Sequence, residues 1–175
     1  MKRHIILLIA FVLMSAQLFA QTPVYLTKAY KPVESDRYTA YSSLEIQGGD
    51  TWNNCFTLGV INNYHGYATF NIGGKYESIS FILGAEKSNG GNDPNIVQIH
   101  ADGKRIFDHV LRDGDLGQQF TLNISGVDKL EFSLLKPEVE AAFCEVALWT
   151  KGQTPHDLRG KNDPQVKTRM LFRDI

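Results

Sequence analysis

The sequence predicts an all-β protein built as an antiparallel β-sandwich. Four short runs alternate apolar with polar residues, which is typical of strands with one face in a core and the other toward solvent. Turn residues separate these runs at short intervals, and no stretch carries a helical stripe of apolar residues. Roughly nine short strands without helices favour a sandwich of the jelly-roll type.

The alternation also predicts which side chains enter the core. The expected inward positions are Ala68, Phe70 and Ile72; Ile79, Phe81 and Leu83; Phe120, Leu122 and Ile124; and Leu130, Phe132 and Leu134. Asp102-Gly103 predicts a tight hairpin between 96–101 and 104–110. Pairing Ala101 with Lys104 would place His100 opposite Arg105 and His109 opposite Ile96. The two histidines would then share a face about 13 Å apart, too far for one metal ion.

The first twenty residues resemble a secretory signal. Lys2 and Arg3 precede an apolar run over 5–14, and Ala20 then meets the polar Gln21. We expect cleavage after Ala20 and a secreted or periplasmic product without a membrane span, because the apolar run is short for a bilayer. The alternative is an uncleaved N-terminal anchor.

Length and charge predict one domain and exclude nucleic acid as a partner. The 175 residues hold 18 Lys+Arg and 19 Asp+Glu, and removing two positive charges with 1–20 leaves 16 against 19, a net charge of −3. Such a chain offers no basic field for nucleic acid. The expected organisation is a signal peptide over 1–20, an extended N-terminal arm over 21–37, a sandwich over 38–150 and a charged tail over 151–175. Met170–Phe172 could add a closing strand.

Export changes the interpretation of the two cysteines. Cys55 and Cys144 both belong to the expected mature chain and would meet an oxidising compartment. They either form a disulfide that closes a loop of about 90 residues or remain two buried free thiols. The sequence leaves both alternatives open, because it does not supply the separation of their Cα atoms.

The sequence contains no signature of catalysis or of cofactor binding. Gly-x-Ser-x-Gly, a phosphate loop, a dinucleotide fingerprint and His-Glu-x-x-His are all absent. We therefore expect no catalytic residues and no cofactor. Oxygen atoms over 112–117 could hold calcium, but a solvated turn is the simpler expectation. The four histidines outside the signal are expected on the surface, and a metal site stays undefined.

Two Asn-rich stretches carry aromatic residues that suit a sugar ligand. Trp52 lies in the first stretch, 48–54, and Asn63, Tyr64, His65 and Tyr67 lie in the second, 62–67. An aromatic plane meets the C–H face of a sugar ring, while Asn and His side chains bind its hydroxyls. In the alternative interpretation, Trp52 caps the sandwich and Tyr64 packs beneath its own loop. Trp149 ends an apolar run and is expected in core or edge packing.

The order of several short motifs resembles the NPCBM family, the novel putative carbohydrate-binding modules. A Gly-Lys-Tyr turn (Gly74–Tyr76) precedes a strand that ends in Gly84, and an Asp-Gly-Lys hairpin (Asp102–Lys104) and a Ser-Gly-Val turn (Ser125–Val127) follow. The resemblance covers about 38–150. It implies a galactose-binding-like β-sandwich that binds glycans through loops at one end.

The combined expectation is an exported, non-catalytic protein that binds a glycan or glycoconjugate. A protein-interaction or structural domain on the same scaffold is the main alternative, because a fold alone does not decide function. A small glycan-active enzyme is a third hypothesis, and it would require a loop-end pocket with two close carboxylates.

Overall fold

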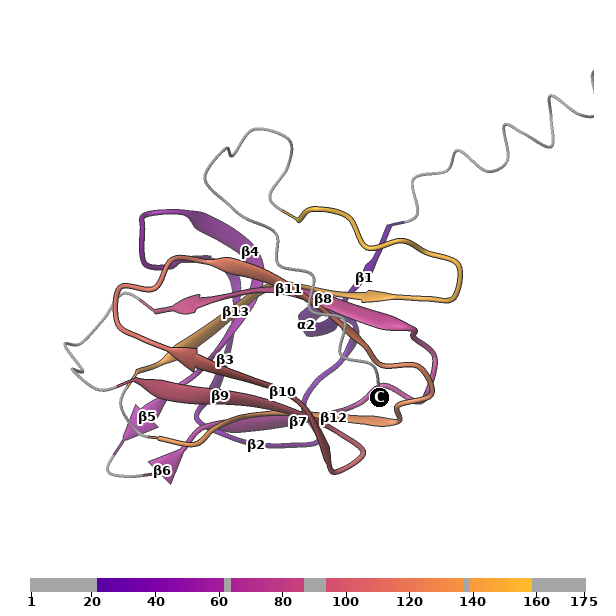
Figure 1. Ribbon diagram of the computed structural model, residues 1–175, viewed down its shortest axis with the longest axis horizontal. Coiled ribbons are helices and arrows are strands. Elements are labelled where there is room, and N and C mark those ends of the chain that lie inside the picture. Colours follow the sequence, from indigo (N-terminus) through magenta and orange to yellow (C-terminus); the bar gives the residue numbers. More distant parts are fainter. Residues whose placement is uncertain (1–21, 62–63, 87–93, 137–138, 159–175) are drawn as a thin grey trace, which may run out of the picture.

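Two antiparallel sheets pack face to face in the computed structural model of the protein, which describes residues 22–61, 64–86, 94–136 and 139–158 (Figure 1). The expected signal peptide, Asn63 and Met170–Phe172 lie outside these ranges. Sheet A has the order β11 (Gln118–Asn123), β8 (Ser78–Ala85), β13 (Ala141–Trp149), β4 (Thr51–Leu58) and β3 (Tyr38–Glu45). Sheet B has the order β10 (Lys104–Leu111), β9 (Asn95–Ala101), β12 (Lys129–Leu134), β7 (Tyr67–Asn71) and β2 (Glu34–Asp36). The predicted all-β sandwich is confirmed.

The core between the sheets consists of the side chains that the alternation assigned to it. All twelve expected inward residues belong to one buried cluster. Phenylalanines fill its centre: Phe56 stacks on Phe143 with ring centroids 4.9 Å apart, and Phe132 meets both rings edge-on. Offset and edge-to-face contacts of this kind stabilise a core beyond the area they bury.

The segment expected as an N-terminal arm belongs to both sheets. Its strand β1 (Val24–Tyr25) pairs with β13, and β2 pairs with β7. Between them, α2 (Leu26–Ala29) forms a single helical turn and buries Leu26 completely in the core. These elements contain only two to four residues each, too few for a periodic pattern to show in sequence. No helix in the described residues is long and apolar enough to cross a membrane.

Strand β13 changes its partner halfway along sheet A. Ala141–Phe143 pair with β4, whereas Ala147 and Leu148 pair with β1, and β8 accompanies β13 on its other side. A bulge between Cys144 and Ala147 marks the change. Glu145 lies in this bulge at φ 49°, and Asn54 on β4 also has a left-handed φ of 51°. Both strands therefore turn away from each other at this level.

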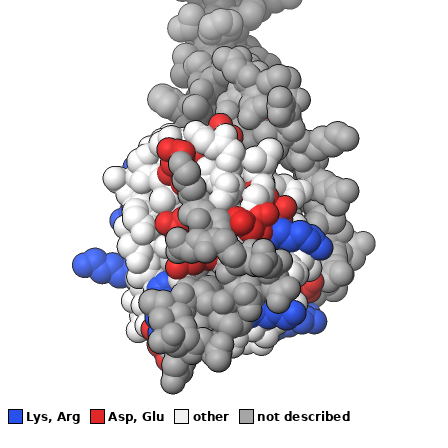
Figure 2. Space-filling model, turned by 90° about the vertical axis from the view of Figure 1, so that its left-hand side faces the viewer, with Lys and Arg blue, Asp and Glu red and all other residues white. Residues whose placement is uncertain are grey.

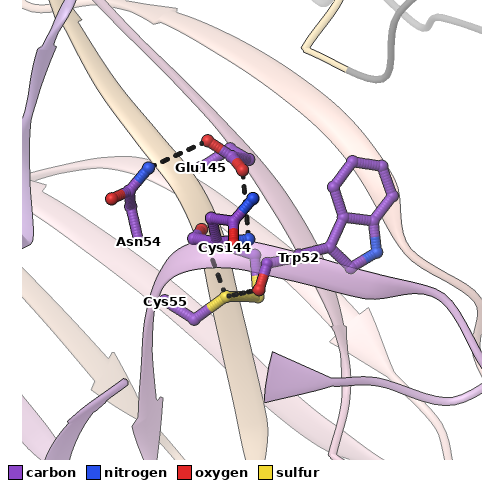
Figure 3. Close-up of a disulfide and its surroundings, with 6 residues drawn as sticks. Trp52, Asn54, Cys55, Cys144 and Glu145 are labelled. Atoms are coloured by element: carbon purple, nitrogen blue, oxygen red, sulfur yellow. Dashed lines mark hydrogen bonds between the residues drawn. A yellow bond between two sulfur atoms is a disulfide. The ribbon is translucent and has the colours of Figure 1, made fainter. Parts of the chain in front are cut away.

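Hydrogen bonds to Glu145 hold the point where β4 leaves β13 (Figure 3). Its carboxylate accepts from the Asn53 backbone N–H at 3.0 Å and from the Asn54 side-chain amide at 3.2 Å. Tyr25 of β1 also donates to Glu145, and burial together with this carboxylate raises the pKa of the Tyr25 hydroxyl. One side chain thus joins β13 to both β4 and β1.

Cys55 and Cys144 form a disulfide, which settles the alternative that the sequence left open (Figure 3). The bond links β4 to β13 one residue beyond the Phe143–Phe56 pair. Both cysteines are fully buried. They face away from the central core, because they alternate with the inward residues Phe56 and Phe143.

The β3–β4 hairpin folds across the outer face of sheet A. Its base pairs with β13, but Ile46 near its tip bridges to Glu86, and the Gln47 N–H donates to the Ala85 carbonyl at 3.1 Å. In the sheet order, β13 and β4 separate β8 from β3. The tip reaches β8 only by crossing over β13, and it covers a second small cluster: Ile46, Trp52, Cys55, Ile82, Ala142 and Cys144.

The β9–β10 hairpin confirms the predicted turn but corrects one histidine. Lys104 pairs with Ala101, and His100 faces Arg105, as expected. A bulge between Arg105 and Phe107 then places His109 opposite Val97 rather than Ile96. His109 consequently turns inward against Phe120, with ring centroids 5.0 Å apart, and burial lowers the pKa of its imidazole.

The start of the C-terminal tail packs on the outer face of sheet A. Gln119 on β11 donates to the His156 carbonyl and accepts from the Leu158 N–H. The His156 ring meets Trp149 edge-on at 4.9 Å. Trp149 is 1% exposed and donates to Ser80 at 3.0 Å, so its predicted packing role is confirmed.

Loss of the disulfide is expected to lower stability substantially. The bond joins residues 89 positions apart, and a loop of that length corresponds to about 4–5 kcal/mol of unfolded-state entropy. Urea unfolding of the oxidised and reduced protein should show a lower midpoint after reduction, and Cys55→Ala/Cys144→Ala should unfold like the reduced form. Equal midpoints with and without reductant would contradict this role.

Gly117 is expected to be required for the hairpin crossing. A Cβ at this position would lie 2.7 Å from Ile46 Cδ1 and 2.9 Å from Ile82 Cγ2. We expect Gly117→Ala to cost about 1–3 kcal/mol of unfolding free energy by overpacking. Ile46→Val removes the nearer methyl group, Cδ1. The double variant should therefore lose less unfolding free energy than the two single variants lose in sum. Strict additivity in thermal unfolding would show that the hairpin does not press on Gly117.

Candidate functional site

A pocket of about 270 Å³ opens on the outer face of sheet A, beside the β3–β4 hairpin. Its lining combines hydroxyl, carboxyl, guanidinium and aromatic groups from distant parts of the chain: Arg37, Thr39, Tyr41, Thr57, Gly59, Glu86 and Glu140. Ligand pockets commonly measure roughly 300–1,000 Å³. This pocket is therefore suited to one small ring rather than to a long chain.

The pairing of β3 with β4 places three of these side chains together. Thr39 lies opposite Thr57, and Tyr41 lies opposite Cys55. Phe56 and Leu58 point into the core, so Thr57 between them points outward. Two neighbouring strands thus supply two hydroxyl groups and one aromatic ring to the same face.

The Thr57 side chain brings a hydroxyl group to the pocket. Thr57 is only 4% exposed, and it is one of the residues that line the pocket. A threonine hydroxyl can both donate and accept hydrogen bonds. The Thr57 hydroxyl is therefore suited to bind a polar group in the pocket.

Two carboxyl groups meet at the end of the pocket where β8 and β13 adjoin. Ala85 pairs with Ala141, and the Glu86 N–H donates to the Glu140 carbonyl at 3.1 Å. The side chains of Glu86 and Glu140 share a hydrogen bond, which requires a proton on one of them. Burial, this hydrogen bond and the negative charge of Glu140 raise the pKa of Glu86 to about 7.

The hypothesis of a small glycan-active enzyme requires two close carboxylates in a loop-end pocket, and this carboxyl pair can be compared with that requirement. Glycosidases hold their two carboxyl groups roughly 5–10 Å apart, on either side of the bond that they cleave. Glu86 and Glu140 are instead in direct hydrogen-bond contact. The pair can donate one hydrogen bond and accept others, but it does not have the spacing of a glycosidase acid and nucleophile.

Arg37 adds a positive charge to the same pocket. It has a left-handed φ of 51°, and its carbonyl accepts from the Gly59 N–H at 2.9 Å. Its Nε lies 3.8 Å from the Asp36 carboxylate. The guanidinium offers several N–H donors, so donors and acceptors both face the pocket.

Trp52 lies away from this pocket. It is 9% exposed and packs in the cluster beneath the hairpin, with Ile46 and Ile82 among its neighbours. Its indole Nε1 has no hydrogen-bond partner among the described residues. Trp52 is near the start of β4, whereas Gly59 follows its end. The structure therefore places Trp52 where the capping alternative put it, apart from the second aromatic stretch.

The second stretch is divided between a separate two-stranded ribbon and sheet B. Tyr64 and His65 form strand β6 (Tyr64–His65), which pairs with β5 (Val60–Ile61). The His65 side chain is exposed, and a Cβ at the following Gly66 would lie 2.7 Å from the Gly59 carbonyl, so this ribbon adjoins the pocket. Tyr67 alternates with the inward Ala68 and faces outward from sheet B, where its hydroxyl donates to Glu34 at 3.3 Å.

This end of the sandwich carries a concentration of acidic groups. Figure 2 views it from the left of Figure 1 and shows acidic side chains mostly toward the middle and basic ones mostly toward the edges.

Within the described ranges, no group of three or more His, Cys, Asp and Glu residues could hold a metal ion. In the stretch 112–117, Asp115 accepts from the Arg112 N–H at 2.7 Å and Asp113 accepts from Gln47 at 3.4 Å.

Sequence patterns did not reveal the pocket residues. Thr39, Tyr41 and Thr57 occupy outward positions of two paired strands, a signal that becomes visible only when the strand register is known. Glu86 and Glu140 lie 54 positions apart in the sequence and meet because β8 pairs with β13. No local motif connects them.

Solved structures with a similar fold include several carbohydrate-binding modules. CBM51 from Clostridium perfringens GH95, solved in complex with methyl-galactose, has a TM-score of 0.57 and 12% identity over 73% of this chain and 99% of that one. The M60 catalytic domain with CBM51-1 and CBM51-2 from Clostridium perfringens ZmpB has a TM-score of 0.58 and 16% identity, over 73% of this chain but 15% of that one. CBM51-2 with the INT domains of the same protein, in complex with GlcNAc, has a TM-score of 0.50 and 9% identity, over 69% and 29% of the two chains.

Sequence comparison identifies the family directly. No curated protein matches this sequence significantly. The NPCBM/NEW2 domain matches residues 15–152, which are well over half of the chain, and the similarity of folds at low identity agrees with this match. The resemblance inferred from the turn and hairpin motifs is confirmed, and the chain belongs to the NPCBM/NEW2 domain family.

Proposed function

We propose that this protein is an exported, non-catalytic carbohydrate-binding module and that it binds a glycan in the pocket on sheet A. The observation that carries the proposal is the lining of one small pocket by hydroxyl, carboxyl, guanidinium and aromatic groups, with the largely buried Thr57 among them. Membership of the NPCBM/NEW2 family supports a carbohydrate ligand. The disulfide supports a secreted or periplasmic location, because such bonds persist in oxidising compartments.

The pocket chemistry suits the edge of a sugar ring. Ring hydroxyls both donate and accept, and here they meet threonine hydroxyls, an arginine and a carboxyl pair. Tyr41 gives the same pocket an aromatic ring for the C–H face of the sugar. We place His65 at the rim, because a Cβ at the next residue, Gly66, would lie 2.7 Å from the Gly59 carbonyl oxygen. Trp52 supports the hairpin rather than the ligand.

The carboxyl pair also supports a binding role through its cost to the fold. Two carboxyl groups held together at one end of a sheet lose stability once both ionise. A backbone hydrogen bond from the Glu86 N–H to the Glu140 carbonyl already joins the strand ends there without any contribution from the two carboxyl groups. Groups that strain a fold without supporting it are typical of functional sites.

Replacement of Thr57 is expected to weaken glycan binding specifically. Thr57→Val keeps the shape and removes the hydroxyl, and one such hydrogen bond corresponds to about a 2- to 10-fold loss of affinity. Thr69→Val is the matched control, because Thr69 is also 4% exposed but belongs to β7 in sheet B. Titration with methyl galactosides and N-acetylglucosamine by ligand-observed NMR measures both variants. The proposal fails if no sugar on a glycan array binds, or if both variants bind like the wild type.

The raised pKa of Glu86 is expected to make stability depend on pH. Folding shifts this pKa from 4.5 to about 7, so the native state retains a proton that the unfolded chain releases. The free energy of unfolding should therefore fall as pH rises from about 4.5 to 7 and then level off. Solvent screens a partly exposed carboxyl, so we expect a decrease on the order of 1 kcal/mol. Glu86→Gln should flatten this part of the profile in urea unfolding; an unchanged slope would contradict the assignment.

A further inference from the structure

We infer that the sheet A pocket selects sugars without an ionised group and rejects sugars that carry a carboxylate, such as uronic or sialic acids. This inference rests on the proposed function and names the class of ligand for the same pocket. Its basis is the paired arrangement of Glu86 and Glu140 in the lining of the pocket, together with the partner of Arg37.

The backbone holds the two carboxyl groups in place. The Ala85–Ala141 pair fixes the strand ends, and the Glu86 N–H bonds the Glu140 carbonyl at 3.1 Å. Gly59 lies directly beside them, since a Cβ there would be 3.2 Å from Glu140 Oε1. Neither acidic side chain can leave the pocket without breaking its contact with the other, so a ligand meets both together.

Residues from several elements face the carboxyl pair, but few of them carry a charge. Arg37 before β3 is the only cation among the described lining residues, and Tyr41 and Thr39 of β3, Thr57 of β4 and Gly59 are uncharged at neutral pH. Arg37 also lies beside Asp36, at 3.8 Å from Nε to the carboxylate oxygen. Its charge is therefore shared between Asp36 and the pocket, and it does not offset a third carboxylate brought by a ligand.

A neutral sugar matches the same groups. A carboxyl pair that shares one proton can accept hydrogen bonds from two adjacent hydroxyls, while the Arg37 guanidinium and the Thr57 hydroxyl donate to the oxygen atoms of the ring. An ionised sugar would instead bring a carboxylate against Glu86 and Glu140, and like charges in one site oppose binding. The pocket thus combines attraction for hydroxyls with repulsion of anions.

Paired sugars that differ in one carboxylate test this inference. Galactose against galacturonic acid, and glucose against glucuronic acid, can be titrated as methyl glycosides by ligand-observed NMR at pH 8 and pH 5. At pH 8 the wild-type protein should bind the neutral member of each pair about tenfold or more tightly. At pH 5 Glu86 is protonated, since its pKa is about 7. The ratio of the affinity for the neutral sugar to that for the acidic sugar should then decrease.

Two conservative variants locate the selectivity. Glu140→Gln and Glu86→Gln keep the shape and the capacity for hydrogen bonds, and each should reduce the neutral-to-acidic ratio at pH 8 by about threefold or more. Asp108→Asn is the control, because Asp108 faces outward on β10 in sheet B. Uronic acids that bind as tightly as neutral sugars at pH 8, or Gln variants with an unchanged ratio, would overturn the inference while leaving glycan binding intact. Absence of binding by every sugar would overturn the proposed function and this inference with it.

Discussion

The organisation of sheet A depends on the change of partner along β13. Its first half pairs with β4 and its second half with β1, and the bulge between the halves places Glu145 where it can bond both. Once β4 is released from β13, the β3–β4 hairpin is free to cross the outer face of the sheet and bury Ile46. The disulfide fastens the strands just before they separate. The crossing therefore begins from a covalently fixed base.

The pocket is a consequence of the same arrangement. The crossing hairpin forms one side of the outer face, and the ends of β8 and β13 form the other, so a hollow remains between them. The outer face of an antiparallel sheet commonly meets solvent. Here the hollow on that face is lined partly by the buried Thr57 and by a pair of carboxyl groups. A hollow with these groups offers a ligand hydrogen bonds more than apolar area. This property fits the carbohydrate ligands proposed for this member of the NPCBM/NEW2 family.

Local patterning was sufficient for the sandwich but not for its short connecting elements. Runs such as Phe120–Ile124 and Leu130–Leu134 contain enough residues for a period of two to identify their buried face, and all of their inward residues lie in the core. The elements between Val24 and Asp36 are too short to show any period, and their pairing to both sheets follows from contacts with β13 and β7. The bulge beside Ile106 similarly reversed the orientation of His109, because one extra residue exchanges the faces of a strand.

The sequence by itself determined the all-β class, the inward residues of the central strands, the Asp102-Gly103 hairpin and the family. These features depend on neighbours within a few residues of each other, or on the order of such local motifs. Only the tertiary structure decided that Cys55 and Cys144 are bonded, that Trp52 packs beneath the hairpin, and that Glu86 meets Glu140. Each of these facts depends on which strands are adjacent and in which register. Side chains brought together in this way carry no shared local pattern, because long-range pairing, rather than sequence spacing, sets their distance.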